Sequence, residues 1–422
     1  MLEKPKENVI PIEAADEQSE MKRVIMMRVK RIVLTAAICL LSVLSLAACN
    51  GEDSQEHSGL PYSSVNFVKS VEFIKVALHN SDTRSINDVD LTKGQIAANT
   101  VLFVTLSNAD NSDKSDSYAT TAFFLTGFPR RVRVQRGPEA EGITLVAYIW
   151  AVEMDLSKVN VYQGSAQISP GGSITNVPIG NGVTVDLGKA FFVFSYMVAA
   201  AGSPTGSALQ IAGQFLDNGT LNFNRGDTTA DATIYWFVVE AKNNEFTTQF
   251  QTVAIPANSS NATSSAFASV STTHSMLIGS AWSTATADVG VNRHGLICTP
   301  VGTGPRMGQI YIERADVTND TIEAWVFIVT FHGNELVNHG VVNSVGTGPH
   351  DTFVDQTGVD TTISMPWNPM GVHPSESKVT TQGLISGSYA GFSWSGVDID
   401  IFQRGSTNSP AQVAWEVVQW NF

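Results

Sequence analysis

The residues best suited to metal or acid–base chemistry gather in the second half of the chain. Six of the eight histidines lie between residues 274 and 373, and the segment FHGNELVNHGVVNSVGTGPHD holds three of them beside Glu335 and Asp351. Imidazole and carboxylate groups can bind zinc, but ligands on one strand need alternate positions, or a fold that brings them together. The spacing shows neither, which favours solvated histidines. We therefore predict no metal site and no cofactor.

A second candidate is the acidic run NADNSDKSDSY, residues 108–118, in which Asp110, Asp113 and Asp116 recur at intervals of three. Calcium takes about six to eight oxygen ligands. The run lacks the alternating spacing and central glycine of an EF-hand, so a solvated loop is the favoured interpretation.

Catalytic signatures are missing from the sequence. It contains no G-x-S-x-G, no H-E-x-x-H and no phosphate-binding loop ending in Gly-Lys-Ser/Thr. The chain is therefore predicted not to be an enzyme. One enzymatic alternative stays open, a polysaccharide-acting enzyme whose carboxylates come from separate loops, because such a pair needs no local motif.

The most promising binding segment is SMPWNPMGVHPSES, residues 364–377, where Trp367 lies among three prolines. A rigidly held aromatic ring suits stacking on a sugar or a protein hot spot. Trp367, Asn368 and His373 are therefore candidate ligand-binding residues. The alternative is that this segment plugs the open end of a β-sandwich.

One pattern recurs four times and sets the expected architecture. Four arginines, at intervals of 89, 89 and 90 residues, each end an alternating apolar run, and a tryptophan follows: Arg136 and Trp150, Arg225 and Trp236, Arg314 and Trp325, Arg404 and Trp415. The last three pairs are eleven residues apart, and the first pair fourteen. A fixed period indicates a repeated structural unit. Equivalent arginines could line four shared sites, or each could cap loop carbonyls left unpaired by a sharp turn.

Each unit is interpreted as a β-hairpin. Alternation before the arginine predicts a strand with one buried face. The segment TIYWFVVE, residues 233–240, is apolar at both parities, so that strand must be covered on both faces. One face belongs to the core of its own module, and we expect the other to pack on a neighbouring sheet or module.

The predicted fold is all-β, with four tandem antiparallel β-sandwich modules of about 89 residues and six or seven strands each. The expected modules are residues 65–156, 157–243, 244–333 and 334–422, after a signal region (1–48) and a tether (49–64). Hydrophobic residues make up 43% of the chain, enough for several cores. A net charge of −14 disfavours nucleic acid as a partner.

The N-terminal region carries an export pattern. Basic residues at positions 22–31 precede the apolar segment 32–46, which is too short for a comfortable membrane span. The segment ends in LAAC, residues 46–49, and this order resembles the lipobox of bacterial lipoproteins. The resemblance covers about thirty residues and implies cleavage before Cys49, followed by its acylation. The acidic first twenty residues suggest that translation starts at Met21 or later.

These features together predict a lipid-anchored protein of a bacterial cell envelope. Asn50 follows the cysteine where an aspartate would resemble an inner-membrane retention signal, which favours the outer membrane. Cys298, among apolar neighbours, is expected to be a buried thiol. We expect a non-enzymatic binding or adhesion scaffold, held to the membrane by acyl chains on Cys49, with a glycan or envelope protein as possible partner. The alternative is a structural subunit of an envelope assembly.

Overall fold

The computed structural model describes the chain from residue 66 to residue 420 with gaps. The described residues are 66–78, 86–93, 95–108, 120–137, 145–199, 210–226, 228–284, 296–314, 317, 319–344, 350–370, 377–379, 390–403 and 411–420. Several predicted residues lie outside them: Cys49, the aspartates at 110, 113 and 116, His373 and Arg404.

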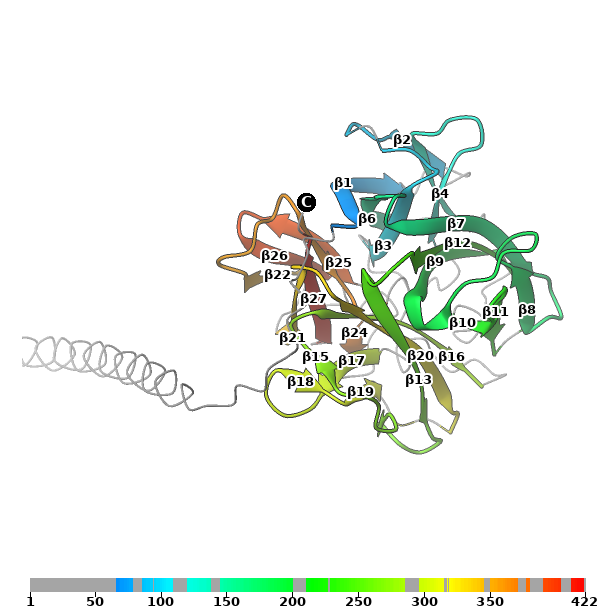
Figure 1. The fold of residues 1–422 in the computed structure, drawn as a ribbon. Helices are drawn as coiled ribbons and strands as arrows, with labels where there is room; N and C mark the ends of the chain where they lie inside the picture. Colours follow the sequence, from blue (N-terminus) through cyan, green and yellow to red (C-terminus); the bar gives the residue numbers. More distant parts are fainter. Residues whose placement is uncertain are drawn as a thin grey trace, which may run out of the picture. The chain divides into compact units, whose positions relative to one another are not determined.

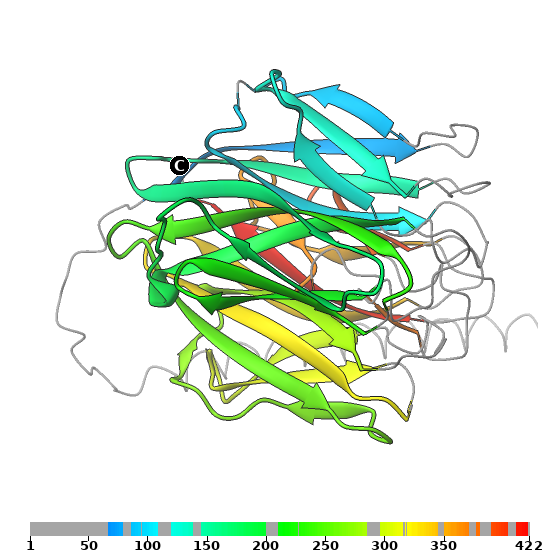
Figure 2. The same cartoon turned by 90° about the vertical axis from the view of Figure 1, so that its right-hand side faces the viewer.

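Regular structure in the described residues is almost entirely β-strand (Figures 1 and 2). The exception is one short 3-10 helix, η2 (Leu187–Lys189), capped by the side chain of Asp186. Within the described ranges, no helix has the length and apolar character needed to cross a bilayer.

Module 1 has six strands: β1 (Val68–Leu78), β2 (Ile86–Asp90), β3 (Thr100–Asn108), β4 (Thr120–Phe124), β5 (Arg131–Arg136) and β6 (Leu145–Met154). They form two three-stranded antiparallel sheets, with strand orders β1-β6-β3 and β2-β5-β4. The central strands are β6 and β5, the two strands on either side of the repeated arginine.

The same plan recurs three times. Module 2 contains β7 (Val159–Ile168), β8 (Ile174–Pro178), β9 (Ala190–Ala199), β10 (Ile211–Asp217), β11 (Thr220–Arg225) and β12 (Asp231–Ala241). Module 3 contains β13 (Phe246–Ile255), β14 (Asn261–Thr263), β16 (Ser275–Ser283), β17 (Leu296–Val301), β19 (Gln309–Arg314) and β20 (Ile322–Phe331), with a small added pair, β15 (Val270–Ser271) and β18 (Arg306–Met307). Module 4 contains β21 (Leu336–Ser344), β22 (His350–Asp355), β23 (Ser364–Trp367), β24 (Ser377–Val379), β25 (Ala390–Ser395), β26 (Asp398–Gln403) and β27 (Ala411–Gln419).

Strand order is conserved between the modules. The sheets are β7-β12-β9 and β10-β11-β8 in module 2, and β13-β20-β16 and β14-β19-β17 in module 3. In module 4 they are β21-β27-β23, with β24 also paired to β27, and β22-β26-β25. The prediction of an all-β fold with four repeated sandwich modules is confirmed.

The predicted hairpin around each arginine is wrong. β11 and β12 do not pair with each other, because each is the central strand of a different sheet, and β5–β6, β19–β20 and β26–β27 follow the same rule. The Arg-containing turn is therefore an arch that crosses from one sheet to the other. An alternating strand followed by a polar turn is typical of both arrangements, so the local pattern could not separate them.

The second strand of each unit is covered on both faces, as expected. In β12 the side chain of Trp236 belongs to the core, and that of Phe237 faces module 1, where its ring centroid lies 6.3 Å from that of Phe124. In β20, Phe327 lies 5.4 Å from Phe192 and 5.7 Å from Phe215 of module 2. The second apolar face is therefore a boundary with the preceding module of the same chain.

These boundaries share a geometry. At the boundary of modules 1 and 2, the backbone N–H of Ala122 on β4 donates to Ser195 Oγ on β9 (3.1 Å). At the boundary of modules 2 and 3, the N–H of Gly213 on β10 donates to Ser280 Oγ on β16 (3.0 Å). In both cases the fourth main strand of one module meets the third main strand of the next.

The series of boundaries closes on itself. β17 of module 3 contacts β27 of module 4, and β25 of module 4 contacts β3 of module 1, so the last module packs on the first (Figure 1). Phe103 of β3 meets Trp367 of β23 at 5.3 Å between ring centroids. An aromatic cluster draws on all four modules: Phe67, Phe191, Phe246, Phe331 and Trp420.

Candidate binding grooves at the module boundaries

The proline-rich segment does not present a ligand platform. Trp367 is only 2% exposed and Asn368 is fully buried. The Asn368 amide donates to the carbonyl of Ala414 (3.3 Å) and its oxygen accepts from the N–H of Met370 (2.8 Å). The expectation that Trp367 and Asn368 meet a ligand at the surface is wrong for this structure, because burial against module 1 leaves no ring face for stacking. The plug interpretation fits.

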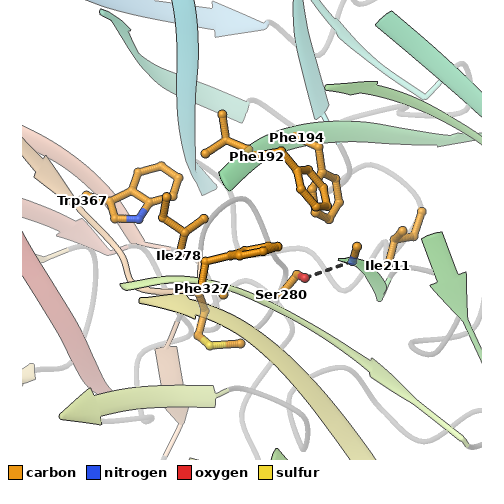
Figure 3. Close-up of a pocket in the computed structure, with 11 residues that line it drawn as sticks. Phe192, Phe194, Ile211, Ile278, Ser280, Phe327 and Trp367 are labelled. Carbon is orange, nitrogen blue, oxygen red and sulfur yellow. Dashed lines mark hydrogen bonds between the residues drawn. The ribbon is translucent and has the colours of Figure 1, made fainter. Parts of the chain in front are cut away.

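A small cavity of about 20 Å³ lies beside Trp367 (Figure 3). Its walls are Phe192 and Ile211 of module 2 and Ile278 and Phe327 of module 3. A space of this size holds about one water molecule, and Trp367 Nε1 is buried without a hydrogen-bond partner. The cavity is therefore too small for an organic ligand.

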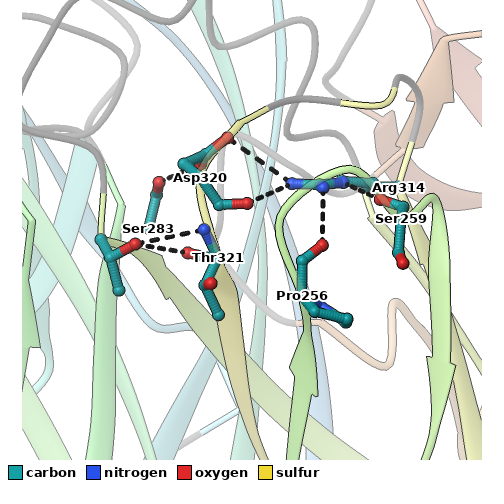
Figure 4. Close-up of polar contacts among 7 residues, drawn as sticks. Pro256, Ser259, Ser283, Arg314, Asp320 and Thr321 are labelled. Carbon is teal, nitrogen blue, oxygen red and sulfur yellow. Dashed lines mark hydrogen bonds and ion pairs between the residues drawn. The ribbon is translucent and has the colours of Figure 1, made fainter.

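Two of the repeated arginines, Arg225 and Arg314, are structural caps. Arg314 is fully buried and donates to the carbonyls of Ser259 (2.7 Å), Pro256 (3.1 Å) and Asp320 (3.1 Å), with the Asp320 carboxylate 3.6 Å away (Figure 4). Arg225 is 1% exposed and donates to the carbonyls of Ser169 and Gly172. Each guanidinium satisfies backbone acceptors from the loop that leaves the first strand of its module.

Arg136 is buried in the same way, at 1% exposed. The Arg225 and Arg314 guanidinium groups are buried and donate to loop carbonyls, so they do not line a ligand site. The capping interpretation is supported at Arg225 and Arg314.

The tryptophans are only partly equivalent. Trp236 lies opposite Gly164, and Trp415 opposite Gly340, on the first strands of their modules. A Cβ atom at either glycine would lie 2.3 Å from the indole ring. Only glycine therefore leaves room for the tryptophan side chain at these two positions. Trp325 lies opposite Thr252 instead. Trp325 therefore occupies a different place in its strand pairing from Trp236 and Trp415, although all three tryptophans lie eleven residues after the repeated arginine.

Two grooves on the described part of the chain each include one of these tryptophans. Groove A, about 440 Å³, lies between modules 1 and 2 and is lined by Ala97, residues 123–127, Pro129, residues 163–165 and residues 235–237. Groove B, about 510 Å³, lies between modules 3 and 4 and is lined by Thr272, Thr273, Pro300, Gly302, Gly304, Arg306, residues 337–339, Gln356 and Trp415.

The two grooves occupy equivalent places. In each, one wall comes from the fourth main strand and following turn of the earlier module, and the other from the first and last strands of the later one. Both turns contain a glycine with positive φ, Gly127 (+82°) and Gly304 (+62°). That conformation favours glycine.

Groove A is lined by aromatic and neutral polar side chains. Phe123 and Tyr235 stack in parallel, with ring centroids 3.9 Å apart and an interplanar angle of 3°. Gln163 and Ser165 project outward from β7 at its exposed positions. Burial raises the pKa of Tyr235, although Arg133 opposes the shift, so its hydroxyl is a neutral donor and acceptor.

Groove B is more polar and contains charge. His339 Nδ1 lies 2.8 Å from Glu416 Oε1, and Nε2 lies 2.9 Å from the carbonyl of Thr272. Both ring nitrogens face acceptors, which favours the imidazolium form. Burial alone would lower the pKa of His339, but Glu416 and the Thr272 carbonyl raise it above its usual value. Arg306 is exposed on the opposite wall.

Glu416 occupies a place that is aromatic in the other modules. In the strand register, Glu416 lies opposite His339. The equivalent residues of β6, β12 and β20 are Trp150, Phe237 and Phe327, which lie opposite Phe73, Gln163 and Phe250. Glu416 is fully buried and also accepts from the N–H of Leu277 on β16 of module 3 (3.1 Å). At this boundary an ion pair therefore replaces aromatic packing.

The described residues provide little evidence for a metal site or a reactive thiol. They contain no group of three or more His, Cys, Asp or Glu side chains placed to hold a metal ion. Cys298 is 1% exposed, and burial raises the pKa of its thiol, as expected for a buried cysteine. The described linings of both grooves include no carboxylate.

Comparison with known proteins identifies no family. No protein-family model and no curated protein matches the chain. A chain in the structure of infectious bursal virus derived T=1 particles aligns at 8% identity, covering 85% of this chain and 80% of that chain, with a TM-score of 0.09. A TM-score this low carries no argument about fold or function.

Sequence reasoning missed both grooves. Their linings combine residues from neighbouring modules, such as Phe123 with Tyr235, which are far apart in the chain. The sequence did contain one signal, the recurring pair of a glycine and a tryptophan: Gly164 with Trp236 and Gly340 with Trp415. A glycine on one strand allows the indole ring of a tryptophan on the neighbouring strand to lie across it.

Proposed function

We propose that this chain is a lipid-anchored, non-enzymatic binding scaffold of a bacterial cell envelope, held by acyl chains on Cys49. The LAAC sequence after an apolar segment supports the anchor. Acyl chains contribute about 0.8 kcal/mol per buried CH₂, which would hold an acidic protein at a membrane that its charge does not favour.

The observation that carries the binding role is the pair of equivalent grooves. Ligand sites are commonly concave, mostly apolar, and placed at boundaries between domains, with volumes of about 300–1,000 Å³. Grooves A and B fit that description. Four repeated modules provide the rigid frame, and the turns that vary between modules provide the walls.

Two measurements test the proposal. Fractionation of bacteria that produce the full-length chain should recover it with the membranes, and Cys49→Ser should move it to the soluble fraction. Detergent-solubilised full-length protein should bind immobilised surface polysaccharide or envelope protein. Thr126→Trp, which fills groove A, and Asn338→Trp, which fills groove B, should reduce that binding, with Gln167→Trp outside both grooves as the control. Equal binding by all variants would contradict the groove role.

A second candidate, a structural subunit of an envelope assembly, is favoured by four exposed apolar side chains. Each lies near the turn between the fourth and fifth main strands of its module, and they are 36–53% exposed: Phe128, Leu216, Val301 and Val397. Recurring exposed apolar groups suggest a protein partner. Replacing all four with serine should abolish a stable complex isolated from envelopes if this candidate is correct, and leave it unchanged otherwise.

A further inference from the structure

We infer that groove A is a binding site for a short neutral glycan, an inference that rests on the proposed binding role. The first reason is the shape of its wall. The parallel stack of Phe123 and Tyr235 joins the two modules into one aromatic surface, with Phe124 and Phe237 in contact behind it. Aromatic rings offer an apolar body for the C–H face of a sugar, and the tyrosine hydroxyl adds a polar tip.

The second reason is the set of unused polar groups around that surface. The side chains of Gln163 and Ser165 are exposed on β7 and make no hydrogen bond within the described part of the chain. The hydroxyl of Tyr235 lies in the same lining. These three side chains can exchange hydrogen bonds with the hydroxyl groups of a bound sugar.

The third reason is charge. The described lining of groove A contains no charged side chain, and the protein carries a net charge of −14. The nearest cation, Arg133 opposite Phe123, is paired with Asp88, so a polyanionic ligand would meet net repulsion from the protein. Groove B, in contrast, contains Arg306 and His339. Amide, hydroxyl and aromatic groups without charge match the hydroxyls and C–H faces of a neutral hexose chain.

Binding of short neutral gluco-, galacto- and manno-oligosaccharides to the detergent-solubilised full-length protein tests the inference. Gln163→Ala and Tyr235→Phe each remove one polar group without disturbing the ring stack. Gln167→Ala is the matched control, because Gln167 is an exposed glutamine on the same strand outside the groove. We expect one oligosaccharide class to bind and each groove variant to weaken it about tenfold, the loss of one hydrogen bond, with Gln167→Ala unchanged.

Each other outcome overturns the inference in a distinct way. If no neutral oligosaccharide binds, or if only a proline-rich peptide binds in a Gln163-dependent manner, the ligand class is wrong. If an oligosaccharide binds but Gln163→Ala and Tyr235→Phe match the wild type, the site is wrong. The proposed scaffold function is judged separately, by envelope binding of the groove-filled variants.

Discussion

Arg314→Ala should strongly destabilise the protein. The guanidinium is fully buried, donates to three backbone carbonyls and lies 3.6 Å from the Asp320 carboxylate. Removing it leaves the carbonyls of Pro256 and Ser259 and a carboxylate without their cation. Breaking a buried ion pair by removing one partner costs about 3–5 kcal/mol, so we expect a loss near 4 kcal/mol in the free energy of unfolding.

Two comparisons isolate the cause. Arg225→Ala removes the equivalent cap, which donates to the carbonyls of Ser169 and Gly172, and should also destabilise the protein. Arg131→Ala breaks a solvent-exposed two-point ion pair with Asp90 and should have little effect, because exposed pairs contribute little. Guanidinium chloride unfolding followed by tryptophan fluorescence gives all three values. A loss below about 1 kcal/mol for Arg314→Ala would refute the capping argument.

Three further predictions address packing, pH and thiol reactivity. Gly164→Ala should destabilise the protein by about 1–3 kcal/mol, because the new methyl group would overlap Trp236; Gly308→Ala, with ordinary space around it, is the control, and equal effects in thermal melts would contradict this reasoning. Burial raises the pKa of Glu335 to about 7, against the opposing effect of backbone N–H groups, so the folded state favours the protonated form. The free energy of unfolding should fall as pH rises from about 4.5 through 7, on the order of 3 kcal/mol, and Glu335→Gln should remove that part of the pH dependence. Cys298 should react with a thiol reagent only after unfolding, and rapid labelling of native protein would disprove its burial.

Much of the architecture could be predicted from the sequence. The spacing of Arg136, Arg225 and Arg314 indicated the repeat, and apolar residues at both parities around Trp236 indicated a strand covered on both faces. Capping of loop carbonyls by Arg225 and Arg314 was one of the two interpretations that the sequence allowed. These features depend on local periodicity, which a sequence displays directly.

Pairing and closure could not be predicted in the same way. Alternation around Arg225 does not say which strand pairs with which, so the arch was mistaken for a hairpin. The contact of Phe103 with Trp367 joins the first and last modules, and nothing local to either residue marks it. The burial of Trp367 followed from that contact, which is why a surface role for this residue was wrongly expected.

The packing of module 4 on module 1 is the central structural claim, and a double-mutant cycle on Phe103 and Trp367 tests it most directly. Their rings meet edge to face at 5.3 Å in the described structure. Unfolding of the wild type, Phe103→Ala, Trp367→Ala and the double variant should give a coupling free energy of about 1 kcal/mol, as found for such aromatic pairs. Costs that add to within about 0.3 kcal/mol would show that the two residues do not touch and that the modules do not close.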